Sequence, residues 1–365
     1  MNLQPEQDMT STPEYRVIHA SETNAWNKCL GRVGKTDICQ RAEYHEAYST
    51  RDNKPSPIMW TLQIKDKFFC YPFMLSPVII MPTKNTSVIE TGFYDISSVY
   101  GYSGPLSNDE DPVFLADCWK AFDNWADKQG IIAEFIRFSP YTRGRKVAHP
   151  DTDISRNRGC AVIRAGDVET DLLSALPSKT RNMVRRAGKE GYEARELFGV
   201  DWIKSFRHLY ESTMNRNDAG NFFYYDDDYY NALQKLPEKY LRLFGIFSDS
   251  KLASIAMALC NKSMALYHLG ASSADHQRTG AGNLALYTMN SCLLEDGIEF
   301  ITVGGGRTVA DDDPLFRFKK NNAVDVTNYF IGKRVICSEA YEQVRKIWLD
   351  ETGNTEIPGK LIFYR

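Results

Sequence analysis

The fold is decided by the stretch Leu266-Tyr-His-Leu-Gly270, Gln277-Arg-Thr-Gly-Ala-Gly282 and Ile298-Glu-Phe-Ile-Thr-Val303, which runs into Gly304-Gly-Gly306. The first segment is apolar and predicts a strand. The run 283–296 has the spacing of a helix, and Gly297 separates it from a second predicted strand at 298–303. This order of strand, glycine loop, helix and strand predicts a mixed α/β unit.

The glycine loop at 277–282 is a candidate anion site. Glycines between a strand and a helix allow the backbone to approach a ligand closely, and the first N–H groups of the helix remain unpaired. Those donors and the positive end of the helix dipole favour an anion near the N–H groups of Gly280, Gly282 and Asn283. The alternative is a glycine-rich turn that binds nothing.

Composition indicates a two-domain globular protein. The chain has 365 residues, too many for one core, with 43% hydrophobic and 25% charged residues. Eight scattered cysteines without C-x-x-C pairs argue against a zinc site or a disulfide framework, so we expect no metal and a cytoplasmic protein. The polar residues 1–13 predict a loose leader with no secretion signal, and no apolar run is long enough to span a membrane. The net charge of -3 means that an RNA partner would need a local basic patch.

The same pattern of elements occurs twice along the chain. A hairpin is predicted at 58–75, a helix at 109–129 and, after Gly130, a strand at 131–138. The second half repeats this order with a hairpin at 240–259 and the elements around Gly297. Two tandem domains are the economical interpretation, 14–165 and 166–365, of which only the second has the glycine loop. The division suggests that the C-terminal copy binds a donor and the N-terminal copy an acceptor.

A basic helix is predicted between the copies, from Ser178 to Gly191. Asn182, Arg185, Arg186 and Lys189 share one of its faces, which usually means only a solvated surface. A second amphipathic helix is predicted around 203–214. Near the end of the chain, 324–335 predicts a pair of strands and 338–349 a helix.

Several stretches together resemble the FemAB-like branch of the GNAT acyltransferase superfamily. The loop Gln277-x-x-Gly280-x-Gly282 resembles the pyrophosphate-binding loop with which GNAT enzymes hold coenzyme A. The other matching stretches are Tyr100-Gly-Tyr-Ser-Gly-Pro105 with Ile136-Arg-Phe-Ser-Pro140, the basic helix from Leu176 to Gly191, Leu209-Tyr-x-x-Thr213-x-x-Arg216, and Gly304-Gly-Gly followed by Leu315-Phe-Arg-Phe-Lys319. Their order covers about Tyr15 to Lys333.

The resemblance implies two tandem GNAT-like domains, each a mixed sheet flanked by helices, and transfer of an acyl or aminoacyl group to an amine. Some members of the branch use aminoacyl-tRNA and others are thought to use acyl-CoA. This chain lacks a long heptad-patterned insertion and has a full glycine loop, which favours acyl-CoA as the donor. The acceptor would then be a small amine such as a nucleotide-linked amino sugar of a cell-envelope polysaccharide pathway. The alternative is an aminoacyl-tRNA-dependent transferase, and a second is a tandem GNAT module that only binds a ligand.

The resemblance assigns catalysis to Lys319, the lysine of the Phe-Lys motif, which would stabilise negative charge in the transition state. Its alternative is a surface lysine paired with Asp311–Asp313. His268 and Asp312 are candidate bases, although each is also explained by a structural role. No Ser-His-Asp or Cys-His set is evident among the six histidines, so we expect direct attack by the amine without a covalent enzyme intermediate.

The remaining candidates bind substrates. The donor is expected at Gln277, Gly280, Gly282 and Asn283, and the acceptor at Tyr100, Tyr102, Arg185, Arg216 and Phe318. The two arginines would contact a phosphate or carboxylate of the acceptor. The two tyrosines would line its pocket, or form only a rigid aromatic turn. The sequence does not identify the acyl group, and it leaves the oligomeric state open.

Overall fold

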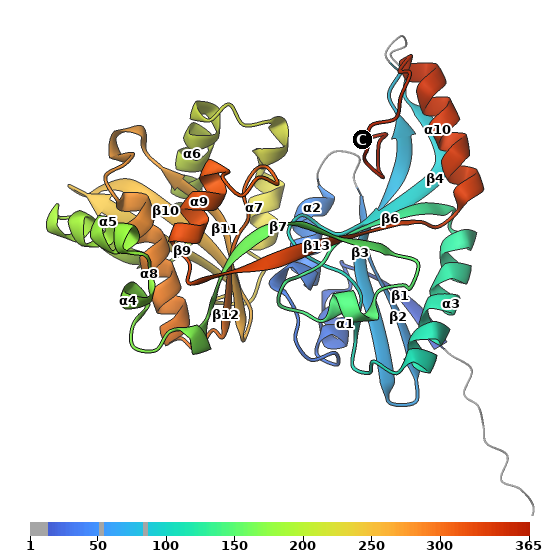
Figure 1. Ribbon diagram of the computed structural model, residues 1–365, viewed down its shortest axis with the longest axis horizontal. Coiled ribbons are helices and arrows are strands. Elements are labelled where there is room, and N and C mark those ends of the chain that lie inside the picture. Colours follow the sequence, from blue (N-terminus) through green and yellow to red (C-terminus); the bar gives the residue numbers. More distant parts are fainter. Residues whose placement is uncertain (1–13, 51–54, 83–86) are drawn as a thin grey trace, which may run out of the picture.

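The molecule has two lobes, joined by the strands β7 (Asp153–Arg164) and β13 (Asp325–Val335), as Figure 1 shows. The computed structural model describes residues 14–50, 55–82 and 87–365. The predicted leader at 1–13 lies outside the described residues.

The first lobe is a mixed sheet with helices on its faces. β4 and β6 are parallel neighbours, and the other strand pairs of this lobe are antiparallel. Aromatic side chains of α3 pack on the sheet, where Trp119 and Phe122 contact Trp60 and Phe69. Its elements are β1 (Glu14–His19), α1 (Thr23–Leu30), η1 (Ile38–Gln40), α2 (Ala42–Ser49), β2 (Ser56–Ile64), β3 (Lys67–Ile80), β4 (Ile89–Ser97), β5 (Leu106–Ser107), α3 (Pro112–Lys128), β6 (Ile131–Arg137) and η2 (Gly144–Val147).

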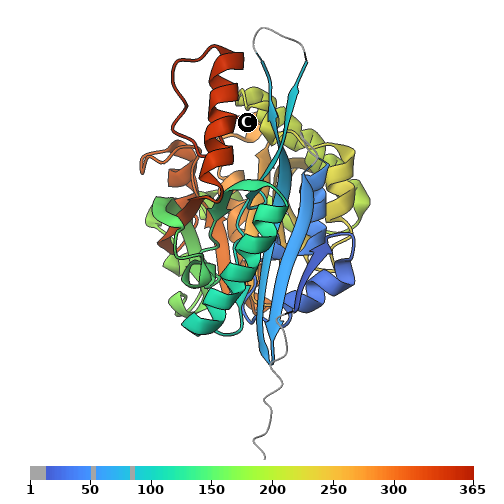
Figure 2. The ribbon, with the colours of Figure 1, turned by 90° about the vertical axis from the view of Figure 1, so that its right-hand side faces the viewer.

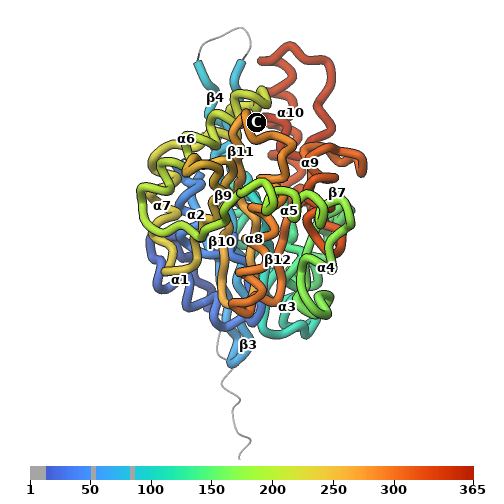
Figure 3. Tube along the Cα trace, turned by 90° about the vertical axis from the view of Figure 1, so that its left-hand side faces the viewer, coloured from blue at the N-terminus to red at the C-terminus, as the bar shows by residue number. Residues whose placement is uncertain are grey.

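The second lobe repeats this plan. β11 and β12 are its parallel pair, and β8, β9, β10 and β11 are antiparallel. The helix α8 packs across β9 and β10, and α5 lies against α8 (Figure 3). Its elements are η3 (Ala165–Asp167), α4 (Leu172–Ala175), α5 (Ser178–Lys189), β8 (Glu193–Leu197), α6 (Val200–Arg216), η4 (Asn221–Phe223), α7 (Asp227–Leu233), β9 (Leu241–Ser248), β10 (Lys251–Cys260), β11 (Met264–Ser272), η5 (Ala274–His276), α8 (Ala281–Glu295), β12 (Phe300–Gly304) and α9 (Pro314–Asn321).

The strand order reveals an internal symmetry with an exchange of strands. Across the main path of the sheet the order is β1-β2-β3-β4-β6-β13-β7-β12-β11-β10-β9-β8, so the two halves mirror each other about the β13–β7 pair. β7 follows the first lobe in sequence but pairs with β12 of the second, and β13 returns to pair with β6. The helix α10 (Ser338–Thr352) also returns, and packs on the first lobe next to β4 and β6 (Figure 2). The proposed domain boundary at 165/166 stays a prediction, and the exchange places one strand of each half in the other.

Two glycines mark the repeat. Gly130 and Gly297 end α3 and α8 with φ of 67° and 84°, a conformation that other residues rarely adopt. The order of strands and helices in both lobes confirms the predicted mixed α/β fold. One local prediction is wrong: 324–335 forms a single long strand, because both of its edges are paired, with β6 and β7.

Candidate functional site

The candidate active site lies where β11 and β12 separate. The two strands pair only at Met264–Phe300, Ala265–Ile301 and Leu266–Thr302, although β11 continues to Ser272. Beyond Leu266 the two strands are no longer paired, and this unpaired stretch is called the opening between β11 and β12. The helix α9 follows β12 and delivers Lys319 to this opening.

Lys319 is partly buried at this opening. Its Nζ atom lies 3.0 Å from the position that a Cβ atom on Gly304 would take, and 5.5 Å from the centre of the Tyr267 ring. Burial lowers the pKa of Lys319 to about 8, while Cys160 and Asp313 act in the opposite direction. The amine is therefore mostly charged at neutral pH and close to its titration range.

The predicted pairing of Lys319 with the acidic stretch does not match its contacts. Asp313 instead caps α9, where its carboxylate accepts hydrogen bonds from the N–H groups of Phe316 at 2.9 Å and Thr308 at 3.0 Å. Asp311 lies 3.7 Å from Arg156. Asp312 is exposed in the loop before α9.

The triple glycine allows three side chains to approach the backbone after β12. A Cβ atom would lie 3.0 Å from Lys319 Nζ at Gly304, 3.0 Å from Arg158 Cδ at Gly305 and 2.5 Å from Asp313 Oδ1 at Gly306. Arg158 also donates to the carbonyl of Gly306 at 2.8 Å. Because these three positions have no Cβ atom, Lys319 and the Asp313 cap of α9 can pack directly against the backbone. The sequence pattern does not reveal these contacts.

His268 is a bulged residue of β11. Met257 pairs with Leu269 and Ala258 with Tyr267, so His268 is the extra residue between them. Its Nε2 atom is hydrogen-bonded to the Tyr229 hydroxyl. Burial and the charge of Lys319 lower the pKa of His268 to about 3, so its ring is neutral at pH 7 and a weak base. These contacts favour a positioning role for the ring over proton abstraction.

The glycine loop caps α8 as the spacing predicts. Gly280 has a φ of 100° and presses against α5, because a Cβ atom there would lie 2.6 Å from the Met183 carbonyl oxygen. The N–H groups of Gly282 and Asn283 have no hydrogen-bond partner among the described residues, as expected for the first turn of a helix. The side chain of Asn283 is bound at 3.1 Å to Asn322, just after α9. The loop and the Lys319 helix are thereby connected.

Arg216 lies beside this loop. It donates to the Ser272 carbonyl at 2.8 Å, and its Nε lies 2.7 Å from the amide oxygen of Gln277 in the orientation that satisfies both groups. Phe318 also faces the loop, with its Cζ atom 3.8 Å from a Cβ position on Gly282. Arg216 and Phe318, which the sequence assigns to the acceptor, thus lie beside the loop that it assigns to the donor, and both assignments stay predictions.

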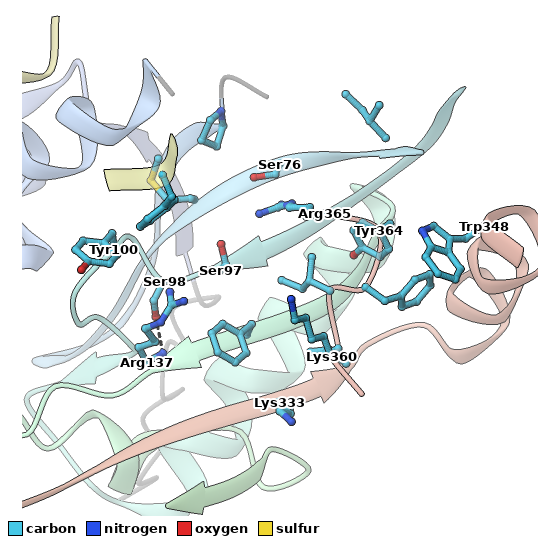
Figure 4. Close-up of a pocket in the computed structure, with 18 of the residues that line it drawn as sticks. Ser76, Ser97, Ser98, Tyr100, Arg137, Lys333, Trp348, Lys360, Tyr364 and Arg365 are labelled. Carbon is cyan, nitrogen blue, oxygen red and sulfur yellow. Dashed lines mark hydrogen bonds between the residues drawn. The ribbon is translucent and has the colours of Figure 1, made fainter. Parts of the chain in front are cut away.

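Tyr100 and Tyr102, the predicted acceptor tyrosines, lie between β4 and β5 of the first lobe. The Tyr102 hydroxyl lies 3.4 Å from Cys160 Sγ and is buried. The Tyr100 carbonyl accepts from the Tyr44 hydroxyl at 2.7 Å, and the Tyr100 ring contacts Phe222. Of the two, Tyr100 lines a cavity of about 1200 Å³ in the first lobe (Figure 4).

Arg185 lies away from these tyrosines. It is exposed on α5, on the basic face that the sequence predicts. Within the described ranges, no group of three or more His, Cys, Asp and Glu side chains is arranged to hold a metal ion. In the same part of the chain, no helix has both the length and the apolar character that crossing a bilayer requires.

The architecture defines a protein of two tandem GNAT-like units. The profile of the FemAB family matches residues 120–243. The crystal structure of FemX superposes with a TM-score of 0.64 and 14% identity, covering 90% of this chain and 99% of that one. These findings confirm the resemblance to the FemAB-like branch of the GNAT superfamily.

Two further solved structures share the fold. One is the C-terminal domain (DUF2156) of a protein described as a lysylphosphatidylglycerol synthetase from Agrobacterium fabrum, with a TM-score of 0.56, 13% identity, and 93% and 99% of the two chains covered. The other is L-PGS from Bacillus licheniformis, with a TM-score of 0.56, 12% identity, and 88% and 96% covered. No curated protein sequence matches the chain.

Sequence reasoning did not identify several residues around Lys319. Tyr267 on β11, Cys160 and Arg158 on β7, and Tyr229 on α7 come from three different elements, and only the fold brings them together. The aromatic stretch 222–230 is the one sequence signal that points to Tyr229.

Proposed function

We propose that this protein is a FemAB-type transferase that moves an aminoacyl group from aminoacyl-tRNA to the amine of an acceptor. The observation that carries the proposal is Lys319, a partly buried amine of the Phe-Lys motif at the opening between β11 and β12. The sequence favours acyl-CoA as the donor, but the FemAB profile and the fold shared with FemX lie closer to the tRNA-dependent alternative. The donor proposed here is therefore aminoacyl-tRNA, in place of the acyl-CoA that the sequence favours.

The reaction needs only positioning and charge stabilisation. The acceptor amine attacks the carbonyl carbon of the aminoacyl ester, and the carbonyl oxygen becomes negative in the tetrahedral intermediate. Lys319 would stabilise that oxygen. The intermediate then collapses, the bond to the ribose oxygen breaks, and the amine proton passes to the leaving oxygen directly or through water. The neutral His268 would hold Tyr229 and the opening in place.

The helix α5 would contact the RNA backbone. Lys179, Arg185 and Lys189 are exposed on it, and the helix packs against the glycine loop at Gly280. A phosphate backbone that follows α5 would reach the unpaired N–H groups of the loop. In this arrangement the tRNA end enters the opening beside Lys319, and the acceptor approaches from the first lobe.

A second candidate is acyl transfer from acyl-CoA to an amino sugar or similar amine. It is favoured by the glycine loop, whose unpaired N–H groups at Gly282 and Asn283 suit a pyrophosphate as well as a nucleic-acid phosphate. The third alternative, a module that binds without catalysis, requires that Lys319 be dispensable.

A donor-binding experiment separates the candidates. Bulk aminoacyl-tRNA and acetyl-CoA are tested against the full chain, tRNA by filter binding over a range of salt and acetyl-CoA by thermal shift. We expect tRNA binding that weakens with salt. Replacing Arg185 and Lys189 by Gln should reduce the slope of log K against log salt by about 1 to 2. Lys346→Gln, an exposed lysine on the distant α10, is the matched control.

The outcomes assign the donor. A rise in melting temperature with acetyl-CoA, combined with no tRNA binding, would replace the proposal by the second candidate. Binding of tRNA without any transfer to amines, unchanged in Lys319→Met, would favour the binding module.

A further inference from the structure

The first lobe contains a cavity that the chemistry at Lys319 does not explain. It has a volume of about 1200 Å³, and lies between the β3–β4 part of the sheet and residues 359–365, here called the C-terminal strap. Figure 4 shows Ser76, Ser97 and Ser98 on the sheet side and Lys360, Tyr364 and Arg365 on the strap side. A volume of this size would accept a ligand larger than a typical drug-sized molecule.

The charged side chains that line the cavity are cationic. Arg137 on β6, Lys333 on β13 and Lys360 on the strap line it, and none of the three forms an ion pair with a described residue. No Asp or Glu side chain is among the described residues that line it. The Asp95 carboxylate behind the wall is bound by Arg365, so the positive charges of Arg137, Lys333 and Lys360 remain to attract a ligand with more than one negative charge.

The rest of the lining is apolar and aromatic. Phe135, Phe222, Trp348 and Ile362 contribute to the walls, and Tyr100 lies at the inner end. Aromatic faces favour a ring-shaped ligand body. The combination of a ring-binding wall and three cations fits an organic phosphate better than a free phosphate ion.

The strap is fixed at both ends of its course. The Tyr341 hydroxyl donates to the Leu361 carbonyl at 2.6 Å, and the Phe363 ring packs edge-on against Trp348 of α10 at 5.6 Å. Arg365 reaches into the lobe and binds the buried carboxylate of Asp95 on β4 at 2.5 Å. These anchors present Lys360 to the cavity and hold the wall in place.

Hydrogen-bonded side chains connect the cavity wall to the candidate active site. Tyr48 lines the cavity, and its hydroxyl lies 3.3 Å from that of Tyr229, which is bonded to His268 beside Lys319. Tyr48 and Tyr229 are both buried, so they form the wall that separates the cavity from the opening between β11 and β12.

We propose that this cavity binds an organic phosphate, and that the C-terminal strap is part of the binding site, supplying Lys360 and a wall anchored through Arg365 to Asp95. The identification of this ligand as the acceptor rests on the proposed function. Binding of the phosphate itself does not, because it requires neither a donor nor turnover.

The test is a calorimetric titration of the full chain at low ionic strength with three probes. 1-Naphthyl phosphate has a ring and a doubly charged group, inorganic phosphate has only the charge, and 1-naphthol has only the ring. We expect 1-naphthyl phosphate to bind at least about tenfold more tightly than either of the others. Equal affinity for 1-naphthol would overturn the anion site.

Variants test the strap directly. Lys333→Met and Lys360→Met should each weaken 1-naphthyl phosphate by about threefold to tenfold, and the exposed Lys346→Met should leave it unchanged. The double variant Asp95→Asn with Arg365→Met removes the anchor without leaving a buried charge unpaired. Its affinity for 1-naphthyl phosphate should fall below that of the single lysine variants. Its thermal unfolding should stay cooperative. Wild-type affinity in both Lys360→Met and the double variant would show that the strap is not part of the site.

Discussion

The two lobes have the same strand plan but differ in what occupies the place where their parallel strands separate. In the second lobe, β11 and β12 open onto Lys319, the bulged His268 and the glycine loop. In the first lobe, the strap and its cationic cavity lie beside β4 and β6, and no Q-x-x-G-x-G loop precedes α3. In the proposed function, this difference divides the work between the units: one would activate a donor and the other would hold an acceptor.

The two seams of the strand exchange differ as well. The seam between β6 and β13 buries Glu134 opposite Arg334, whereas β7 and β12 meet through small and apolar residues such as Ala161 and Gly304. The pairing of β6 with β13 is therefore specific, because Glu134 and Arg334 can each remain buried only when paired with the other.

The largest effect is expected at the charged seam. Arg334 is 5% exposed and binds Glu134 at 3.1 Å and Asp123 at 2.8 Å. Arg334→Met leaves Glu134 buried without a partner, and should lower the free energy of unfolding by about 3–5 kcal/mol, measured by urea denaturation.

Two controls define this result. Replacing both Arg334 and Glu134 by Met should recover most of the lost stability, and Arg195→Met in the exposed pair at the β8 edge should leave the midpoint unchanged. A single variant as stable as wild type would show that the exchanged strand does not depend on this pair.

The glycine loop occurs in the second lobe, which is proposed to bind the donor, and has no counterpart before α3 in the first. A Cβ atom on Gly282 would meet Ser272 and Phe318 at 3.5 and 3.8 Å, so Gly282→Leu leaves the local backbone unstrained and places a side chain over the unpaired N–H groups. The KM for the donor should rise about tenfold, with unchanged stability. Gly166→Leu, at an exposed glycine with open space around it, is the control. Gly280 is unsuitable for this test, because a side chain there would clash with the Met183 carbonyl and strain the backbone.

The pH dependence should report Lys319. Since its pKa is about 8, kcat/KM should fall by about tenfold per pH unit above that value, as the charge on the amine is lost. The unfolded lysine binds its proton up to about pH 10.4, so the unfolded state holds more protons between these values. Wild-type stability should therefore rise with pH from about 8 to 10.4 relative to Lys319→Met. An activity profile without a decline near pH 8 would assign the charge to another group.

Sequence patterns were sufficient for the elements that repeat. The helix 109–129, Gly130 and the following strand are found as α3 and β6, and the loop 277–282 caps α8 as predicted. The exchange of β7 and β13 between the lobes could not be predicted. A strand that is paired on both edges has the same apolar pattern in either lobe, so its sequence does not say which lobe it joins. The pattern at 324–335 predicts two strands, whereas one strand, 325–335, pairs with both β6 and β7.

Residues of the candidate site could be predicted only where they belong to a short sequence motif. Lys319 and the glycine loop stand in short motifs, whereas the proximity of Arg216 and Phe318 to that loop depends on the fold. Lys360 and Arg365 join the first lobe from the other end of the chain, over a separation that no local pattern can reveal.

The proposed function places chemistry in the second lobe and acceptor binding in the first. The most direct measurement is a side-by-side steady-state comparison of Lys319→Met and Lys333→Met with a transferable donor and a phosphate-bearing amine acceptor. Lys319→Met should lower kcat by about 100-fold or more with little change in the KM for the acceptor. Lys333→Met should raise that KM and leave kcat unchanged. A loss of kcat in Lys333→Met, or a change confined to KM in Lys319→Met, would contradict the division of labour between the lobes.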